Sequence, residues 1–227
     1  MTRDIQCFYD CLSVQRMAVF DNQPDLYWLD LRLAEAMYSL LHCLEISLRN
    51  KIHSAAVEFY KQEDWWSCVQ WGDYQREQVA TAIKLAQKNA KIGGKSTHKN
   101  LDVLNNFMFG FWVELFSSDY VALWNGILKH IFVHDDVKRK YVYLKLSQIK
   151  NTRNKIAHFA IITTNKDKLK LRRDDIIEII NLLSPELGEW IREKSNFEEV
   201  FSEFENKSPR RIHPRGTSES DYTENRD

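Results

Sequence analysis

Residues 25–60 read DLYWLDLRLAEAMYSLLHCLEISLRNKIHSAAVEFY, and this stretch decides the fold. Its apolar residues recur at spacings of three and four, the period of a helix with one buried face. These residues are Leu26, Leu29, Leu33, Met37, Leu40, Leu41, Leu44, Leu48, Ile52, Ala55 and Phe59. Pro24 and Asp25 favour a helix start at this point. We therefore predict one long helix through residue 60, with room for a kink along its length.

Further helical patterns follow, and together they predict an all-α fold, a helical bundle with additional helices. The expected helices cover residues 74–91, 101–116, 120–132, 135–159 and 174–194. Gly93-Gly94 is typical of a C-terminal cap, and Pro185 predicts a bend or break in the last helix. We expect one helical domain over residues 1–206 and a flexible polar tail over residues 207–227.

Composition bounds the class of protein. Seven Gly and four Pro are few, whereas seven Trp, nine Tyr and twelve Phe suit helices packed by large side chains. No apolar run approaches the roughly 18 residues that span a bilayer, and the N-terminus does not resemble a secretion signal. We expect a cytoplasmic protein with no membrane contact, no cofactor, no metal and four reduced cysteines.

Charge is balanced over the whole chain but not along it. The 32 basic residues equal the 32 acidic ones, so net charge alone predicts no nucleic-acid partner. Residues 138–173, however, hold twelve Lys or Arg and one acid, whereas residues 174–205 hold ten acids and two basic residues. Such blocks form solvated faces or bind polyanions. For the second case the predicted RNA contacts are Lys138, Arg139, Lys150, Lys155, Arg172 and Arg173.

Inside the basic block lies a polar trio, Arg153, Asn154 and His158. Asn154 and His158 are four residues apart and share a helix face, with Arg153 on the adjoining face. The apolar stripe of this helix, formed by Leu146, Ile149, Ile156 and Ala160, includes the position of Arg153. Because burying a lone guanidinium is costly, we predict that Arg153 has a partner or opens onto a cleft.

The long first helix holds a possible partner. Glu45 falls at the margin of its apolar stripe, with Arg49 one turn further and Asn50 beside it. We hypothesise that Glu45 orients Arg153 or Arg49. The alternative is a buried ion pair that only fixes the register of two helices.

An arginine, an amide and a histidine in a basic setting fit metal-free RNA cleavage. A histidine takes a proton from a ribose 2′-OH or gives one to the departing 5′-oxygen, while an arginine stabilises charge on the phosphate. The products would be a 2′,3′-cyclic phosphate and a 5′-hydroxyl, and DNA would be inert. A histidine with a purely structural role is the alternative.

Several segments resemble a known family. Residues 153–158, RNKIAH, resemble the Arg-x4–6-His signature of HEPN-domain ribonucleases. Residues 44–50, LEISLRN, and residues 109–116, FGFWVELF, followed by Tyr120 and Trp124, resemble the Abi (abortive infection) branch, closest to Abi-F and Abi-D. The resemblance runs in order from about residue 25 to residue 195.

The resemblance implies a function as well as a helical fold. It makes Arg153 and His158 the catalytic pair, Asn154 a supporting residue, and Glu45, Arg49 and Asn50 residues at the site edge. It also implies a homodimer with a composite site, and an anti-phage toxin held by a small noncoding RNA. Abi relatives often continue the motif with a second His and Glu-Pro, where this chain has Phe-Ala-Ile at residues 159–161. A degenerate member that binds RNA without cleaving it is therefore the alternative.

Four weaker features each admit two interpretations. Residues 91–97, KIGGKST, are a phosphate loop or a helix cap, and the cap is favoured because a helix precedes them. His130 and His134 are metal ligands or surface residues at a helix boundary, and the surface is favoured. Aromatic residues in the middle of the chain either stack on RNA bases or form the core or a dimer interface, and core or interface is favoured. These residues are Phe107, Phe109, Phe111, Trp112, Phe116 and Trp124. Arg210, Arg211, His213 and Arg215 contact RNA or belong to a solvated tail.

Overall fold

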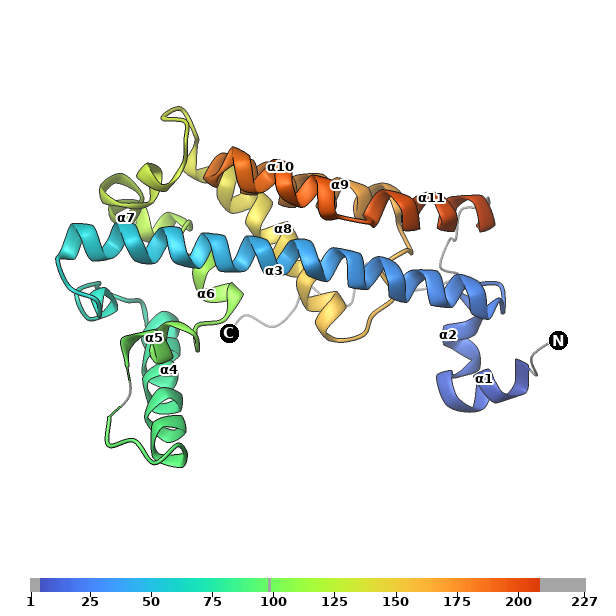
Figure 1. Cartoon of the computed structure of the whole chain (residues 1–227), viewed down its shortest axis with the longest axis horizontal. Coiled ribbons are helices and arrows are strands. Elements are labelled where there is room, and N and C mark those ends of the chain that lie inside the picture. The colour runs from blue at the N-terminus through green and yellow to red at the C-terminus, as the bar shows by residue number, and fades with distance from the viewer. Residues whose placement is uncertain (1–4, 98, 209–227) are drawn as a thin grey trace.

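The computed structural model describes residues 5–97 and 99–208, and one helix organises them (Figure 1). Helix α3, Pro24–Tyr60, runs along the long axis of the molecule without interruption. Every regular element in the described part of the chain is a helix, so the all-α prediction is confirmed. α3 has no break, and it ends where Lys61 adopts a left-handed conformation with φ 58°.

The predicted apolar stripe of α3 is its buried face. Leu26, Leu29, Leu33, Met37, Leu40, Leu41, Leu44, Leu48 and Ile52 are all at most 4% exposed. The stripe shifts near its end, where Ala56 is buried instead of Ala55 and Phe59 is 56% exposed. Burial of nine large side chains on one face explains why this helix forms the centre of the fold.

The other helices form a row beside α3, a crossing helix and two extensions. Helices α9 (Lys166–Leu183), α10 (Pro185–Lys194) and α11 (Phe197–Lys207) form the row, with α10 and α11 antiparallel to α9 (Figure 1). Helix α8 (Arg139–Ala157) crosses α3 and packs against α9. At the N-terminal end of α3 lie α1 (Ile5–Leu12) and α2 (Val14–Ala18), and at its C-terminal end lie α4 (Asp73–Ile92) and α5 (Asn100–Leu104).

Several predicted helix boundaries were wrong. Residues 101–116 are not one helix: α5 ends at Leu104 and α6 covers Phe109–Glu114. The break lets Phe107 stack on Phe111, with ring centroids 4.2 Å apart, so the aromatic core overrides the helical pattern. Residues 120–132 contain α7 (Val121–Gly126) between short 3-10 turns, Ser118–Tyr120 and Leu128–Ile131. A further 3-10 turn, Trp65–Ser67, follows α3.

Other differences lie near the ends of the chain. α9 begins at Lys166 rather than residue 174, because Asn165 accepts a hydrogen bond from the backbone N–H of Lys168 and caps it. Pro185 divides α9 from α10, as predicted. Helices α1, α2 and α11 were not predicted. Lys207 ends α11, and Ser208 after it is 5% exposed, so the first two residues of the predicted tail belong to the folded part. Residues 209–227, including Arg210, Arg211, His213 and Arg215, lie outside the described residues.

Two of the favoured local interpretations, the helix cap and the aromatic core, are confirmed. Gly94 has φ +69°, and Lys95 and Gly94 donate hydrogen bonds to the carbonyls of Ala90 and Lys91, the pattern of a helix C-cap. The predicted aromatic set, Phe107, Phe109, Phe111, Trp112, Phe116 and Trp124, is buried in the core. Within the described residues, no helix is both long and apolar enough to cross a membrane.

Candidate functional site

The polar trio lies at the C-terminal end of α8, which closes earlier than predicted. Ala157 is the last helical residue, and His158 follows as the cap. Phe159 has φ 57°, a left-handed conformation in a residue other than glycine. Phe159 and Ala160 donate to the carbonyls of Ile156 and Lys155, at 3.1 and 2.9 Å. These bonds turn the chain sharply and leave the His158 side chain exposed, with Phe159 81% exposed beside it.

A buried carboxylate holds the loop that follows. Asp30 of α3 is 2% exposed and accepts hydrogen bonds from the backbone N–H groups of Ile162 and Thr163, at 3.1 and 2.9 Å. The Thr163 hydroxyl donates to the same oxygen at 2.7 Å. Burial raises the pKa of Asp30, and these three donors offset part of the rise. Arg16 donates to the Phe159 carbonyl at 2.7 Å, so two elements fix the loop next to His158.

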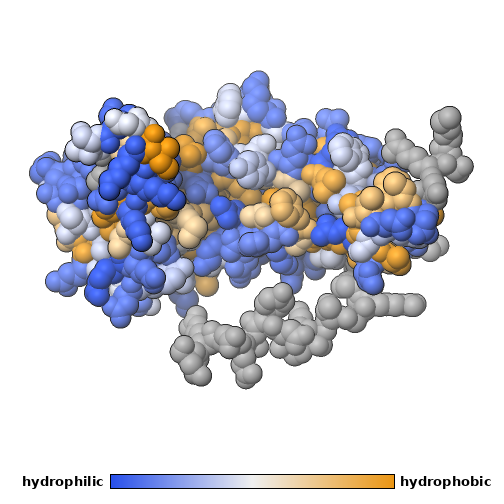
Figure 2. Space-filling model, turned by 90° about the horizontal axis from the view of Figure 1, so that it is seen from below, coloured by the Kyte–Doolittle hydropathy of each residue, from blue (hydrophilic) through white to orange (hydrophobic). Residues whose placement is uncertain are grey.

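An open groove of about 930 Å³ lies between α8 and the start of α9. Asn154, Lys155 and His158 line it from α8, and Lys168 and Arg172 line it from α9. The lower end of α8 and the loop after it project below α3 in Figure 1. The view from below in Figure 2 shows hydrophobic residues scattered among hydrophilic ones on that side. The structure thus brings two members of the trio together with three cations.

Arg153 is not among the residues that line this groove. Its charge acts on Glu45 of α3, where burial raises the pKa of the carboxyl and the charges of Arg153 and Arg49 lower it. Arg153 is half-buried, in agreement with its predicted place in the apolar stripe. Arg49 donates hydrogen bonds to Asn50 at 3.2 Å and to Asn105 at 2.8 Å. Glu45, Arg49 and Arg153 therefore form one electrostatic cluster, separate from the groove that His158 lines.

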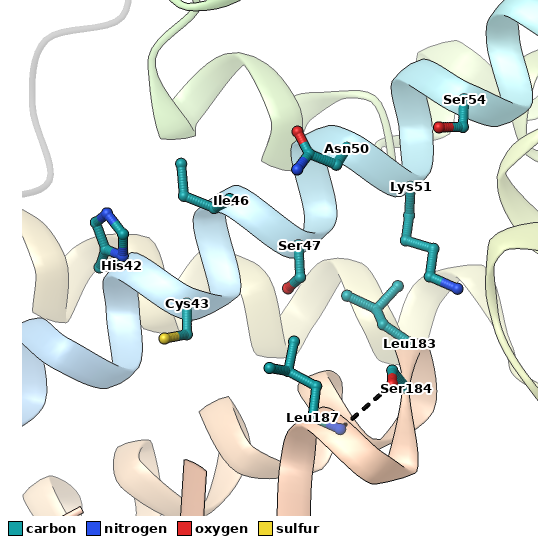
Figure 3. A pocket seen from close by; sticks show the side chains of 10 residues that line it. All are labelled: His42, Cys43, Ile46, Ser47, Asn50, Lys51, Ser54, Leu183, Ser184 and Leu187. Atoms are coloured by element: carbon teal, nitrogen blue, oxygen red, sulfur yellow. Dashed lines mark hydrogen bonds between the residues drawn. The ribbon is translucent and has the colours of Figure 1, made fainter. Parts of the chain in front are cut away.

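Asn50 lines another hollow, of about 620 Å³, between α3 and the junction of α9 with α10. Figure 3 shows Ser47, Asn50 and Lys51 on α3 above Leu183 and Leu187 of the facing segment. The hydrogen bond drawn there runs from the Leu187 backbone N–H to the Ser184 hydroxyl, at 3.3 Å. Through its bond with Arg49, Asn50 links this hollow to the Glu45 cluster.

Much of the basic block is paired within the protein. Lys145 contacts Asp175 and lies 2.9 Å from Glu178, and Arg172 contacts the same Asp175, which is 3% exposed. Burial opposes the charge on Lys145, but hydrogen bonds to Asp175 and Glu178 raise its pKa above the ordinary value. Arg173 lies 2.7 Å from Asp174 and 3.2 Å from Glu198. The adjacent acidic segment therefore neutralises Arg172 and Arg173, two of the six predicted RNA contacts.

Aromatic rings of α11 cover three cations of α9. Lys166, Lys170 and Arg173 lie 5.1, 5.7 and 5.7 Å from the ring centroids of Phe204, Phe201 and Phe197, respectively. Arg139, a further predicted contact, donates to the Phe116 carbonyl at 2.6 Å. Lys138 and Lys155 are exposed and Lys150 is half-buried. Among the predicted RNA contacts, these three lysines are the ones with neither an ion pair nor a side-chain hydrogen bond to another described residue.

His130 and His134 do not share one helix face, because they lie in different local structures. His130 belongs to the turn Leu128–Ile131, and His134 follows in a loop, and both are exposed. Over residues 5–97 and 99–208, no group of three His, Cys, Asp or Glu residues has the arrangement of a metal site.

Sequence reasoning missed Asp30 and Thr163. The available signal was an aspartate inside the apolar stripe of the long helix, since a buried carboxylate requires hydrogen-bond donors. The donors lie more than 130 residues away, so only the fold identifies them.

Comparisons of the chain with protein-family models, with curated proteins and with solved structures give no match.

Proposed function

We propose that the protein is a metal-independent endoribonuclease of HEPN type. One observation carries the proposal: exposed His158 ends α8 at an open groove that also holds Asn154, Lys155 and Lys168. A histidine is the side chain best suited to move protons near neutral pH, and lysines attract a phosphate chain. The resemblance of residues 153–158 to the HEPN signature supports the same reaction.

In the proposed reaction the nucleophile is part of the RNA. The 2′-oxygen attacks the adjacent phosphorus as its proton leaves to a base, and the bond from phosphorus to the 5′-oxygen breaks. The departing 5′-oxygen takes a proton, giving a 2′,3′-cyclic phosphate and a 5′-hydroxyl. His158 moves one of these protons, Asn154 holds the substrate by hydrogen bonds, and Arg153 stabilises charge on the phosphate.

A second copy of the chain belongs to the proposal. His158 lines the groove, whereas Arg153 does not line it and its charge acts on Glu45, so a single chain does not bring both side chains into the same hollow. In a homodimer, the α8 ends of two copies face each other and each site draws on both. Phe159 supports a contact at this place, since a large apolar ring that is 81% exposed beside His158 suits burial by a partner.

The proposed biological role is a cytoplasmic toxin of an abortive-infection system, held inactive by a small noncoding RNA. The resemblance to the Abi branch supports this role. The exposed lysines Lys138 and Lys155 offer contacts to the phosphates of such an RNA. A second candidate function is RNA binding without cleavage, and Phe159 favours it because it replaces the second histidine frequent in Abi relatives.

Incubation of the protein with RNA in EDTA tests the proposal. We expect cleavage products with cyclic phosphate ends, and no cleavage by His158→Ala or Arg153→Ala. His134→Ala, which alters an exposed histidine outside the groove, is the matched control and should cleave normally. Binding of RNA without cleavage by the wild type would favour the second candidate, and neither binding nor cleavage would refute both. A monomeric mass at micromolar concentration would contradict the composite site.

A further inference from the structure

The groove between α8 and α9 has the composition of a nucleotide pocket. Three amide side chains, Gln148, Asn151 and Asn154, follow one face of α8 into it. All three are exposed, and no hydrogen bond joins their side chains to another residue of the described part of the chain. Their donors and acceptors are therefore free for a ligand.

The floor and rim of the groove differ from its amide wall. Ile162 and Leu169, 7% and 3% exposed, contribute apolar atoms to the lining. Lys155 and Lys168 stand at the rim, both exposed and without an ion pair to other described residues. An apolar surface suits the face of a base, amides suit its hydrogen-bonding edge, and the lysines suit the flanking phosphates.

We propose that this groove binds one RNA base beside the cleaved phosphate and selects it through Gln148 and Asn151. The preferred cleavage position that follows from this pocket rests on the proposed function, whereas the binding of the base does not. The volume of about 930 Å³ is sufficient for a nucleotide. His158 lines the same groove, so an RNA strand whose base is held by Gln148 and Asn151 continues along the groove toward the imidazole. Asn154 lines the groove too, but it belongs to the proposed catalytic set, so the variants that probe base selection leave it unchanged.

The experiment measures binding without cleavage. Short oligonucleotides of A, C, G or U carry 2′-fluoro groups, which remove the nucleophile, and their affinities are measured by fluorescence anisotropy. We expect a preference of at least about tenfold for one base, since each amide that pairs with a base edge discriminates by roughly that factor. In the double variant Gln148→Ala/Asn151→Ala this preference should be lost. Both side chains are exposed and alanine favours helix, so the variant keeps its fold.

A matched control is available on α4. Gln87 and Asn89 are likewise exposed amides of a long helix, and Gln87→Ala/Asn89→Ala should retain the full preference. A smaller preference in the wild type, or one that the groove variant retains, would refute the proposed pocket. Cleavage of ordinary RNA with no base preference would leave the nuclease standing and the pocket refuted. Selective binding of one base without cleavage of ordinary RNA would support the pocket and refute the nuclease.

Discussion

Replacement of Asp30 by alanine should release the loop that follows His158. The carboxylate accepts three hydrogen bonds, from the backbone of Ile162 and Thr163 and from the Thr163 hydroxyl. Ile162 and Thr163 are 7% and 1% exposed, so water cannot easily replace the lost acceptor. A buried donor left without a partner costs roughly 1–3 kcal/mol. With two backbone donors stranded and the burial cost of the carboxyl removed, we expect a loss of about 3 kcal/mol in unfolding free energy.

Urea unfolding at neutral pH measures this loss, and two milder variants separate its parts. Asp30→Asn keeps an acceptor oxygen of the same shape and should lose less than Asp30→Ala. Thr163→Val removes only the hydroxyl and should cost about 1 kcal/mol. Amide hydrogen exchange at residues 162 and 163 should accelerate in Asp30→Ala before global unfolding. A loss below about 1 kcal/mol, with unchanged exchange there, would refute the assignment of Asp30 as the anchor of the loop.

The pH dependence of Asp30 has a definite sign. Burial raises the pKa of Asp30 above its usual value of 3.8, so the folded state binds this proton more tightly than the unfolded state. The proton-linked part of the stability is complete below pH 3.8 and is lost as pH rises through the raised pKa, whereas the three hydrogen bonds to the carboxyl remain at neutral pH. In Asp30→Asn this part of the pH profile should be absent.

Three further predictions concern single side chains. Burial likewise raises the pKa of Glu45 above 4.5, so the free energy of unfolding should decline as pH rises from 4.5 through the raised pKa. Glu45→Gln should flatten this decline in unfolding titrations. An unchanged pH profile would contradict the desolvation of Glu45 between α3 and α8. Lys145→Met leaves buried Asp175 with one cation and should cost about 3 kcal/mol, whereas Lys145→Met/Arg172→Met/Asp175→Leu removes all three charges and should recover most of this loss. Equal losses of the two variants in thermal unfolding would argue against the ion-pair cluster. Phe159→Gly relieves the strain of a left-handed residue and should stabilise the monomer by about 0.5–1 kcal/mol. The same variant should weaken the proposed self-association, measured by sedimentation. A less stable monomer would show that the Phe159 ring packs against its own chain.

Particular residues show how far sequence patterns reach. The stripe from Leu26 to Ile52 has the helical period, and it predicted α3 because burial of that stripe is the dominant contribution to its stability. Residues 101–116 have similar periodicity, yet they divide at residues 105–108. There the ring contacts of Phe107 with Phe111 and Trp66 decide the local conformation, and those partners are distributed along the chain.

The candidate site divides in the same way. Periodicity placed Asn154 near His158, and the structure puts both on one groove. It also placed Arg153 in the apolar stripe, and the residue is half-buried with its charge acting on Glu45. The basic block, by contrast, predicted six RNA contacts, and two of them, Arg172 and Arg173, are paired with acidic residues. Which acid meets which cation depends on the antiparallel packing of α9 against α10 and α11.

The sequence by itself determined the helical class, the long central helix, the aromatic core and the neighbouring basic and acidic blocks. Each of these depends on the spacing of residue types along one segment, and a helix turns that spacing directly into a face. Only the tertiary structure decided where α8 ends and what holds the loop after it. It also decided which cations stay free. Buried carboxylates such as Asp30 and Asp175 select their donors by proximity in space, and such proximity arises only when distant helices pack together.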